Sequence, residues 1–298
     1  MEDFMFVDLL GKTRVKLGLH SHTANADGYL GIEERAQRYI DKGYDAIAVT
    51  DPWKYTEEGE SEGLKIISGC EYNVGGIYRV VAVGMTSDPK ISPELQNMVR
   101  TSRAKTADLV KRIHLFNGFA FISRSDELDT PEGVASVDEL DGIEIYGADF
   151  TRAAFDEVYL GDLVDGVMRC GKAPVILASD GIICDDEENG TAVMVESVDM
   201  QTSSIIRALK NGRFYSSQGP EIHLIKLAPD KVKVVCTPAA RIEFICDDKD
   251  CGKEILGDGL IEAEYTVSRG ERFIRAEVTD ADGLMAWSNV VDFDELYR

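Results

Sequence analysis

Up to about residue 220, the chain alternates short apolar runs with segments of helical periodicity. Apolar runs bounded by polar or turn-forming residues are typical of strands in a parallel sheet that is covered on both faces. Such strands are predicted at residues 14–20, 45–51, 64–72, 79–85, 119–124, 141–147 and 174–180. Amphipathic helices are expected at residues 32–43, 102–118, 155–171 and 203–212. This alternation predicts an α/β fold, and about seven strands favour a closed barrel over a short open sheet.

The pattern changes after residue 221, where strands follow one another without helices. They are predicted at residues 223–228, 231–237, 240–248, 260–267, 272–280 and 285–291. Residues 272–280 show the two-residue period of a strand, with Phe273, Arg275 and Glu277 on one face. Short strands separated by turn signals favour a small β-sandwich. We therefore predict two domains, a barrel over residues 1–220 and a sandwich over residues 221–298.

The charge of the chain changes the list of expected partners. It has 298 residues, 44% of them hydrophobic, which is enough for a substantial core. Lys and Arg total 32 and Asp and Glu total 54, so the net charge is −22. Binding to a phosphate backbone requires clustered basic side chains. The composition therefore predicts that nucleic acid is not a partner.

The absence of a membrane helix, a signal peptide and paired cysteines leads to a prediction of the cellular compartment. No apolar run approaches the length of about 18 residues that a membrane helix needs, so no membrane association is expected. The acidic start, MEDFMFVDLL, does not resemble a signal peptide. The six cysteines form no CxxC pair, which favours reduced thiols in a cytoplasmic protein: Cys70, Cys170, Cys184, Cys236, Cys246 and Cys251.

Polar side chains stand at the ends of several predicted strands. The first strand ends in His20-Ser21-His22, and later strands end at Asp51, Glu71, Arg124 and Asp180. In an α/β barrel the carboxyl ends of the strands meet at one face. His20 and His22 point the same way because they are two residues apart, and imidazoles with carboxylates suit Zn²⁺, Mn²⁺ or Fe²⁺. Each acid alone is also explained as the N-cap of a following helix, but the joint pattern favours a metal site.

The same segments resemble the motifs of the polymerase-and-histidinol-phosphatase (PHP) superfamily of metal-dependent phosphoesterases. The matching stretches are LGLHSHTANADG, GYDAIAVTDPWKY, ISGCEYN and ILASDGII, in the order of the family's motifs. GIEIYG and GRFYSSQGPEI resemble stretches of the two-domain members. The resemblance implies a distorted seven-stranded (β/α) PHP barrel followed by a small C-terminal β-sandwich.

The sequence departs from the family where three metal-binding histidines are expected, at Pro52, Arg124 and Ile182. None of these three side chains is a conservative replacement for an imidazole ligand. One metal of the family is held by positions that are all retained here, namely His20, His22, Glu71 and Asp180. The other metal sites use the acid of the first motif, Asp27, together with the missing histidines. The resemblance therefore implies a single divalent ion, Zn, Mn or Fe.

The resemblance implies an enzyme that hydrolyses a small phosphate ester, or another anionic substrate, with a metal-activated water. Asp51 would orient the histidines, Asp27 would orient the water, and Arg124 would clamp the phosphate with two hydrogen bonds. Arg124 is also explained as a salt bridge that fills an abandoned metal position. The alternative function is a catalytically silent relative that binds a small ligand or a protein partner. The sequence makes no prediction about the oligomeric state.

Overall fold

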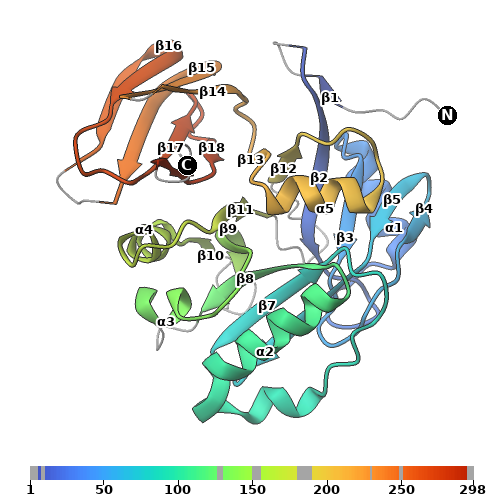
Figure 1. Cartoon of the computed structure of the whole chain (residues 1–298). Coiled ribbons are helices and arrows are strands. Elements are labelled where there is room, and N and C mark those ends of the chain that lie inside the picture. The colour runs from blue at the N-terminus through green and yellow to red at the C-terminus, as the bar shows by residue number, and fades with distance from the viewer. Residues whose placement is uncertain are drawn as a thin grey trace.

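The computed structural model describes residues 6–7, 11–125, 130–149, 156–179, 190–228, 230–247 and 251–293. Strands outnumber helices, and the C-terminal strands lie at one end of the molecule (Figure 1). The helices are α1 (Ile32–Asp41), α2 (Ser102–Leu115), α3 (Pro131–Ala135), α4 (Gly161–Arg169) and α5 (Thr202–Lys210), with 3₁₀ turns η1 (Pro93–Asn97) and η2 (Val99–Thr101). The predicted α/β class is confirmed. No helix in these ranges combines the length and the apolar composition needed to cross a bilayer.

One long sheet joins strands from both ends of the chain. Its N-terminal strands are β1 (Phe6–Val7), β2 (Thr13–Ser21), β3 (Ala46–Val49), β4 (Gly59–Ser61) and β5 (Leu64–Ile67). Strands β2, β3 and β5 run parallel. On the other side of β2 the sheet continues through β12 (Ala192–Val195), β13 (Phe214–Ser217), β18 (Met285–Ser288), β17 (Phe273–Thr279), β15 (Lys231–Cys246) and β14 (Ile222–Ala228). Strands β16 (Lys253–Thr266) and β19 (Val291–Asp292) pair with β15 and β17.

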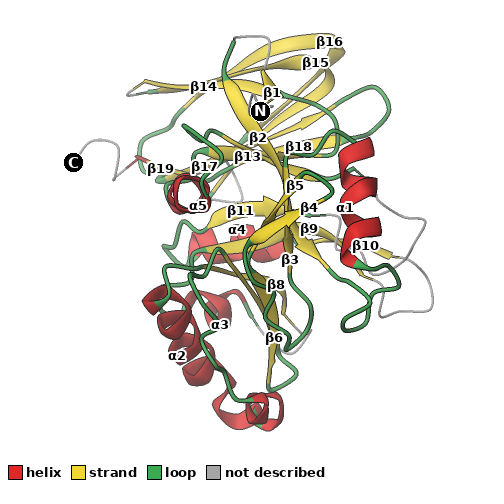
Figure 2. Ribbon diagram, turned by 90° about the vertical axis from the view of Figure 1, so that its right-hand side faces the viewer, coloured by secondary structure: helices red, strands yellow, loops and turns green. Residues whose placement is uncertain are grey.

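A second sheet faces the first. It contains β6 (Gly69–Val74), β7 (Tyr78–Val83), β8 (Phe119–Ser125), β9 (Gly142–Asp149) and β10 (Asp156–Tyr159), with β11 (Val175–Ala178) beside β9. Helix α2 packs on β6, β7 and β8, whereas α1 packs on β4 and β5. The two helices lie on opposite sides of the strands (Figure 2). This arrangement buries β3, β11 and residues 119–123 of β8 between layers, which explains their continuous apolar runs.

The structure joins the strands predicted at 231–237 and 240–248 into β15, and it divides two other predicted elements. The strand predicted at residues 64–72 is two strands, β5 and β6, which belong to different sheets. Ser68 separates them and donates a hydrogen bond from its buried hydroxyl to the Met85 carbonyl. The helix predicted at 155–171 begins only at Gly161, because residues 156–159 pair with β9 as β10. In both cases tertiary pairing divides a run that local periodicity treats as one element.

The structure does not confirm a closed seven-stranded barrel. The two sheets approach through the isolated backbone bridges Pro52–Glu71 and Thr56–Gly69, not through a continuous ladder. It also does not confirm a separate C-terminal sandwich, because β18 pairs with β13 and extends the N-terminal sheet. Hydrophobic pattern shows which strand faces are buried but does not determine which strands pair. The domain boundary at residue 220 stays a prediction.

Side chains from β17 and β18 are buried against the rest of the protein. Trp287 is fully buried and stacks on Tyr146, with ring centroids 5.3 Å apart. Arg275 donates from Nε to Asp165 Oδ1 of α4 at 2.8 Å and also binds Glu277. The Tyr159 hydroxyl donates to the same Glu277 carboxylate. This network ties the C-terminal strands to α4 and β10.

We predict that Arg275→Ala lowers the free energy of unfolding by about 3–5 kcal/mol, because it leaves the buried Glu277 and the partly buried Asp165 without their cation. Urea unfolding followed by circular dichroism measures the change. Arg241 is the matched control, since it also pairs with two carboxylates, Glu243 and Glu254, but is more exposed. Arg241→Ala should cost less than about 1 kcal/mol. Equal losses in the two variants would contradict the prediction.

The expectation of reduced thiols is wrong for one pair of cysteines. Cys246 and Cys251 form a disulfide with Cα atoms 6.0 Å apart. The antiparallel pairing of β15 with β16 brings them together, although their spacing in the sequence is not that of a CxxC pair. Cys70, Cys170 and Cys236 are free thiols. Cys184 lies outside the described residues.

Candidate metal centre

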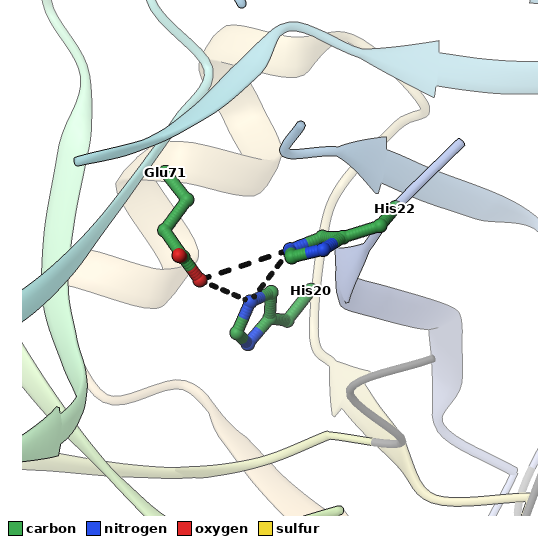
Figure 3. A group of neighbouring side chains, drawn as sticks. All are labelled: His20, His22 and Glu71. Atoms are coloured by element: carbon green, nitrogen blue, oxygen red, sulfur yellow. Dashed lines mark hydrogen bonds and ion pairs between the residues drawn. The ribbon is translucent and has the colours of Figure 1, made fainter. Parts of the chain in front are cut away.

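His20 and His22 stand at the carboxyl end of β2 with their rings side by side. Their Nε2 atoms are 3.3 Å apart, and both side chains are buried. The edge of the Phe121 ring from β8 contacts the His20 ring, with centroids 6.5 Å apart. The predicted common direction of the two imidazoles is therefore observed (Figure 3).

Glu71 reaches the same point from β6. Its Oε2 atom lies 3.0 Å from Nε2 of His20 and 3.7 Å from Nε2 of His22 (Figure 3). Gly69 permits this close approach of β6 to the end of β3, because a Cβ at that position would lie 2.5 Å from the Val49 carbonyl oxygen. The Glu71 amide also donates a hydrogen bond to the Asp51 carbonyl at 3.4 Å. The backbone therefore places the carboxylate opposite both imidazoles.

The three facing atoms have the spacing of metal ligands. Their separations are 3.0, 3.3 and 3.7 Å. Ligands about 2.0–2.1 Å from a tetrahedral ion lie about 3.3 Å from one another. His20, His22 and Glu71 thus form a group of two nitrogen donors and one oxygen donor that fits a divalent ion. The donor types suit Zn²⁺, Mn²⁺ or Fe²⁺.

Each histidine has a second carboxylate on its outer nitrogen. Asp27 Oδ1 lies 2.9 Å from Nδ1 of His22, and Glu144 Oε1 lies 3.3 Å from Nδ1 of His20. Gly28 allows the Asp27 loop to fold back, because a Cβ there would lie 2.8 Å from the His22 carbonyl carbon. Asp27 is 49% exposed at the side chain, whereas Glu144 is buried.

Glu144 is a residue of this site that sequence reasoning missed. The sequence does contain a signal that could have identified Glu144, because this acid lies in an apolar run between Ile143 and Ile145. All three residues are buried. An ionisable side chain in a strand that is buried on both faces requires buried partners. The run matches no metal-binding motif and ends at no histidine, so the sequence pattern alone gives this acid no role.

The buried Asp51 carboxylate acts on the backbone next to the histidines. It accepts hydrogen bonds from the Thr23 amide at 2.6 Å and from the Thr23 hydroxyl at 2.5 Å. These bonds fix the backbone that follows His22. The expected orienting role of Asp51 stays a prediction, with Thr23 as the residue through which it would act.

Two candidate residues are only partly placed, or not placed at all. The backbone of Arg124 lies in β8, opposite Arg79 of β7, but its side chain lies outside what the structure describes. Asp180 and Ile182 lie outside the described residues. Pro52, which the sequence resemblance aligns with a family histidine, forms the backbone bridge with Glu71. The ligand role of Asp180 and the clamp role of Arg124 therefore stay predictions.

The carboxylates shift the protonation of the histidines. Burial would lower the pKa of His20, but Glu144 and Glu71 outweigh it and raise that pKa to about 10. Burial likewise opposes protonation of His22, yet Asp27 and Glu71 raise its pKa. Burial would raise the pKa of Glu71, but hydrogen bonds and positive charge from both histidines hold it well below its usual range. Without a metal, protons supply the positive charge that these carboxylates require.

We predict opposite pH dependences for the metal-free and zinc-loaded protein. The pKa of His20 is about 10 when folded and 6.5 as the reference, so its protonation stabilises the metal-free fold fully below pH 6.5. That contribution is lost as the pH rises through about 10. Zinc competes with the same protons, so its binding strengthens over this range.

Thermal unfolding midpoints of chelator-treated and zinc-loaded protein, measured from pH 6.5 upward, test this expectation. The His20→Gln variant isolates the contribution of the imidazole. The difference between wild type and variant should shrink with rising pH when metal is absent, and should grow when zinc is present. A constant difference in both series would contradict the proposed proton–metal competition.

No family model and no curated protein sequence matches the chain. Its whole length is similar to a solved structure from Bacteroides vulgatus, a two-domain protein containing a predicted PHP-like metal-dependent phosphoesterase. The two are 16% identical, the match covers 96% of this chain and 98% of the other, and the TM-score is 0.55. This likeness confirms the predicted resemblance to the PHP superfamily at the level of the fold.

Weaker likenesses involve an endonuclease. The lesion-specific endonuclease Q from Pyrococcus furiosus is 11% identical, with 66% of this chain and 56% of that chain covered and a TM-score of 0.46. A complex of endonuclease Q with a 27-mer duplex that carries an abasic lesion is 14% identical, with 66% and 57% covered and a TM-score of 0.45.

The prediction from composition that nucleic acid is not a partner is wrong. Solved structures similar to this chain include the endonuclease bound to duplex DNA. Net charge sums over the whole surface, whereas binding depends on the local field of one face and on any bound cation. A charge of −22 therefore does not exclude nucleic acid.

Proposed function

We propose that this protein is a metal-dependent phosphoesterase that hydrolyses a small phosphate ester with a single divalent ion. The observation that carries the proposal is the convergence of His20, His22 and Glu71 at metal-ligand spacing. Asp180 is the proposed fourth ligand, since it follows the end of β11 in the sequence. The PHP-like fold supports the same assignment.

When bound, the ion supplies Lewis acidity toward a phosphoryl oxygen and lowers the pKa of a water nucleophile. The residues of the chain hold and orient the reactants. Asp51 fixes the backbone after His22 through Thr23, and Asp27 lies beside His22 at the exposed side of the group. On β8, Arg124 comes three residues after Phe121, whose ring contacts the His20 ring. It is proposed to bind the substrate phosphate where the family has a histidine.

We predict that the purified protein carries about one equivalent of Zn, Mn or Fe, as a single site with at least three protein ligands requires. Glu71→Ala should lose the metal, since it removes the only oxygen donor of the described cluster. Turnover of p-nitrophenyl phosphate should fall by more than about 100-fold, the upper cost of losing even an outer partner of a ligand. Elemental mass spectrometry and absorbance assays give the two readouts.

Glu139→Ala is the control, because Glu139 is exposed and lies near His114, not near the cluster. It should keep both metal and turnover. Metal-free wild-type protein, even after incubation with excess ions, would refute the proposal.

We predict that Arg124→Gln raises KM for p-nitrophenyl phosphate by about 10–100-fold and leaves metal content unchanged. A hydrogen bond to a charged group is worth about 1.5–3 kcal/mol, which corresponds to that range. Arg124→Lys should recover part of the loss, because it restores charge without the bidentate geometry. Steady-state kinetics at saturating metal separates KM from kcat. An unchanged KM in both variants would favour the salt-bridge explanation of Arg124.

A second candidate function is a catalytically silent protein that binds a small ligand. A cavity of about 800 Å³ between α4 and the C-terminal strands favours it. Its wall mixes basic and acidic side chains, among them Arg169, Lys253, Asp162 and Glu254, which suits a polar molecule. Metal binding without turnover of any phosphate ester would favour this candidate over the hydrolase.

We also propose the division into a barrel-like unit over residues 1–220 and a β-rich unit over residues 221–298. The full-length likeness to a two-domain protein supports it. Helices α1 to α5 all precede residue 220, and strands alone follow it up to Asp292 among the described residues.

A further inference from the structure

Glu144 is a buried carboxylate that the proposed mechanism does not use. It lies in β9, is 4% exposed, and its Oε1 atom is 3.3 Å from Nδ1 of His20. The Ser179 hydroxyl, just beyond the end of β11, donates a hydrogen bond to the same oxygen. Burying a carboxylate is costly unless donors satisfy it, so these contacts fix where the group can lie.

Gly147 and Phe121 are neighbours of the Glu144–His20 contact. A Cβ at Gly147 would lie 3.0 Å from Glu144 Oε2, so the glycine provides space beside this oxygen. On the other side, the edge of the Phe121 ring borders His20. Gly147 therefore leaves space for the carboxylate, and Phe121 packs beside the imidazole.

The contact determines which nitrogen of His20 is available. The Glu144 carboxylate can only accept a hydrogen bond, so Nδ1 keeps its proton when a metal displaces the proton on Nε2, and Nε2 then supplies the lone pair. Nε2 is the atom that faces Glu71 at 3.0 Å and His22 at 3.3 Å. Carboxylates behind metal-binding histidines set ring orientation and raise ligand basicity in this way.

We propose that Glu144 is a positioning residue that holds His20 with Nδ1 protonated and Nε2 directed at the ion, and that Ser179 holds Glu144. This inference rests on the proposed metal site. It adds β9 and β11 to the elements that build the site, although neither contributes to the described donor group. Ser179 also directly precedes Asp180, so the same hydrogen bond secures the strand end before the proposed fourth ligand.

The test compares Glu144→Leu, Glu144→Gln and Ser179→Ala with wild-type protein. Zinc affinity is measured by competition with a chromophoric chelator. Glu144→Leu should weaken binding by about 10–100-fold, the usual cost of removing such a partner. Glu144→Gln should lose less than about 10-fold, because its amide oxygen still accepts the Nδ1 hydrogen. Ser179→Ala should fall between wild type and Glu144→Leu.

A spectroscopic readout separates positioning from a structural role. Long-range ¹⁵N–¹H correlation spectra of the zinc-loaded protein report which nitrogen of His20 is protonated. Wild type and Glu144→Gln should show Nδ1 protonation, and Glu144→Leu should show a shifted or exchanging signal. Glu277→Gln is the matched control, because it alters another buried glutamate, whose hydrogen-bond partners are Arg275 and Tyr159 and not a histidine. It should lower stability without changing zinc affinity.

Three results overturn the inference. Unchanged zinc affinity in Glu144→Leu and Glu144→Gln would show that His20 needs no such partner. If Glu144→Leu does not fold, wild-type affinity in both Glu144→Gln and Ser179→Ala leads to the same conclusion. Wild-type protein without zinc affinity would instead refute the proposed metal site itself, and the positioning role would fall with it.

Discussion

The Glu71 carboxylate is buried against two imidazoles, and it can remain charged there only if positive charge is shared with it. Protons on the histidines supply that charge in the metal-free chain, and a divalent ion can supply it with better geometry. Much of the surrounding structure serves this arrangement. The ends of β2 and β6 belong to different sheets, so the two sheets must meet where the donors meet. A shift of either strand end would leave a buried charge without its partner.

The segment after β3 shows how the chain differs from the family whose motifs it resembles. The motif resemblance aligns Pro52 with a ligand histidine of the family, and the Pro52 backbone pairs with Glu71. Trp53 follows in a left-handed conformation with φ of 59° and donates its amide hydrogen to the Glu71 carbonyl at 2.9 Å. Such a conformation is uncommon for a bulky side chain and persists only when packing enforces it. The Trp53 ring meets Tyr72 edge to face at 5.4 Å. In this chain, Pro52 and Trp53 instead form backbone contacts that fix Glu71 of β6.

Local patterns predict the elements better than their partners. The apolar runs locate β2, β3, β8 and β11, and the two-residue spacing of His20 and His22 predicts their shared direction. The order of the strands in the sheets is harder to predict from the sequence, because periodicity identifies buried faces and says nothing about which edges pair. Residues 64–72 have the pattern of one strand, although Ser68 divides them between sheets.

The role of Glu144 could not be predicted for a related reason. Its partner His20 is 124 residues away in the sequence, and only the fold brings the two side chains together. The disulfide between Cys246 and Cys251 depends on the antiparallel pairing of β15 with β16, which no cysteine spacing rule describes.

The pairing of β13 with β18 limits how the molecule can be divided in practice. A fragment ending at residue 220 would expose β13 as an open sheet edge with unpaired backbone groups, which invites association with other chains. It would also remove Trp287 from its stack on Tyr146 and leave an apolar hollow in the barrel-like unit. Only two strands, β13 and β12, separate that edge from β2 and its histidines. Residues before 220 contain the candidate donors, but β18 completes the edge of their sheet, so the C-terminal strands cover an edge that could otherwise pair with other molecules.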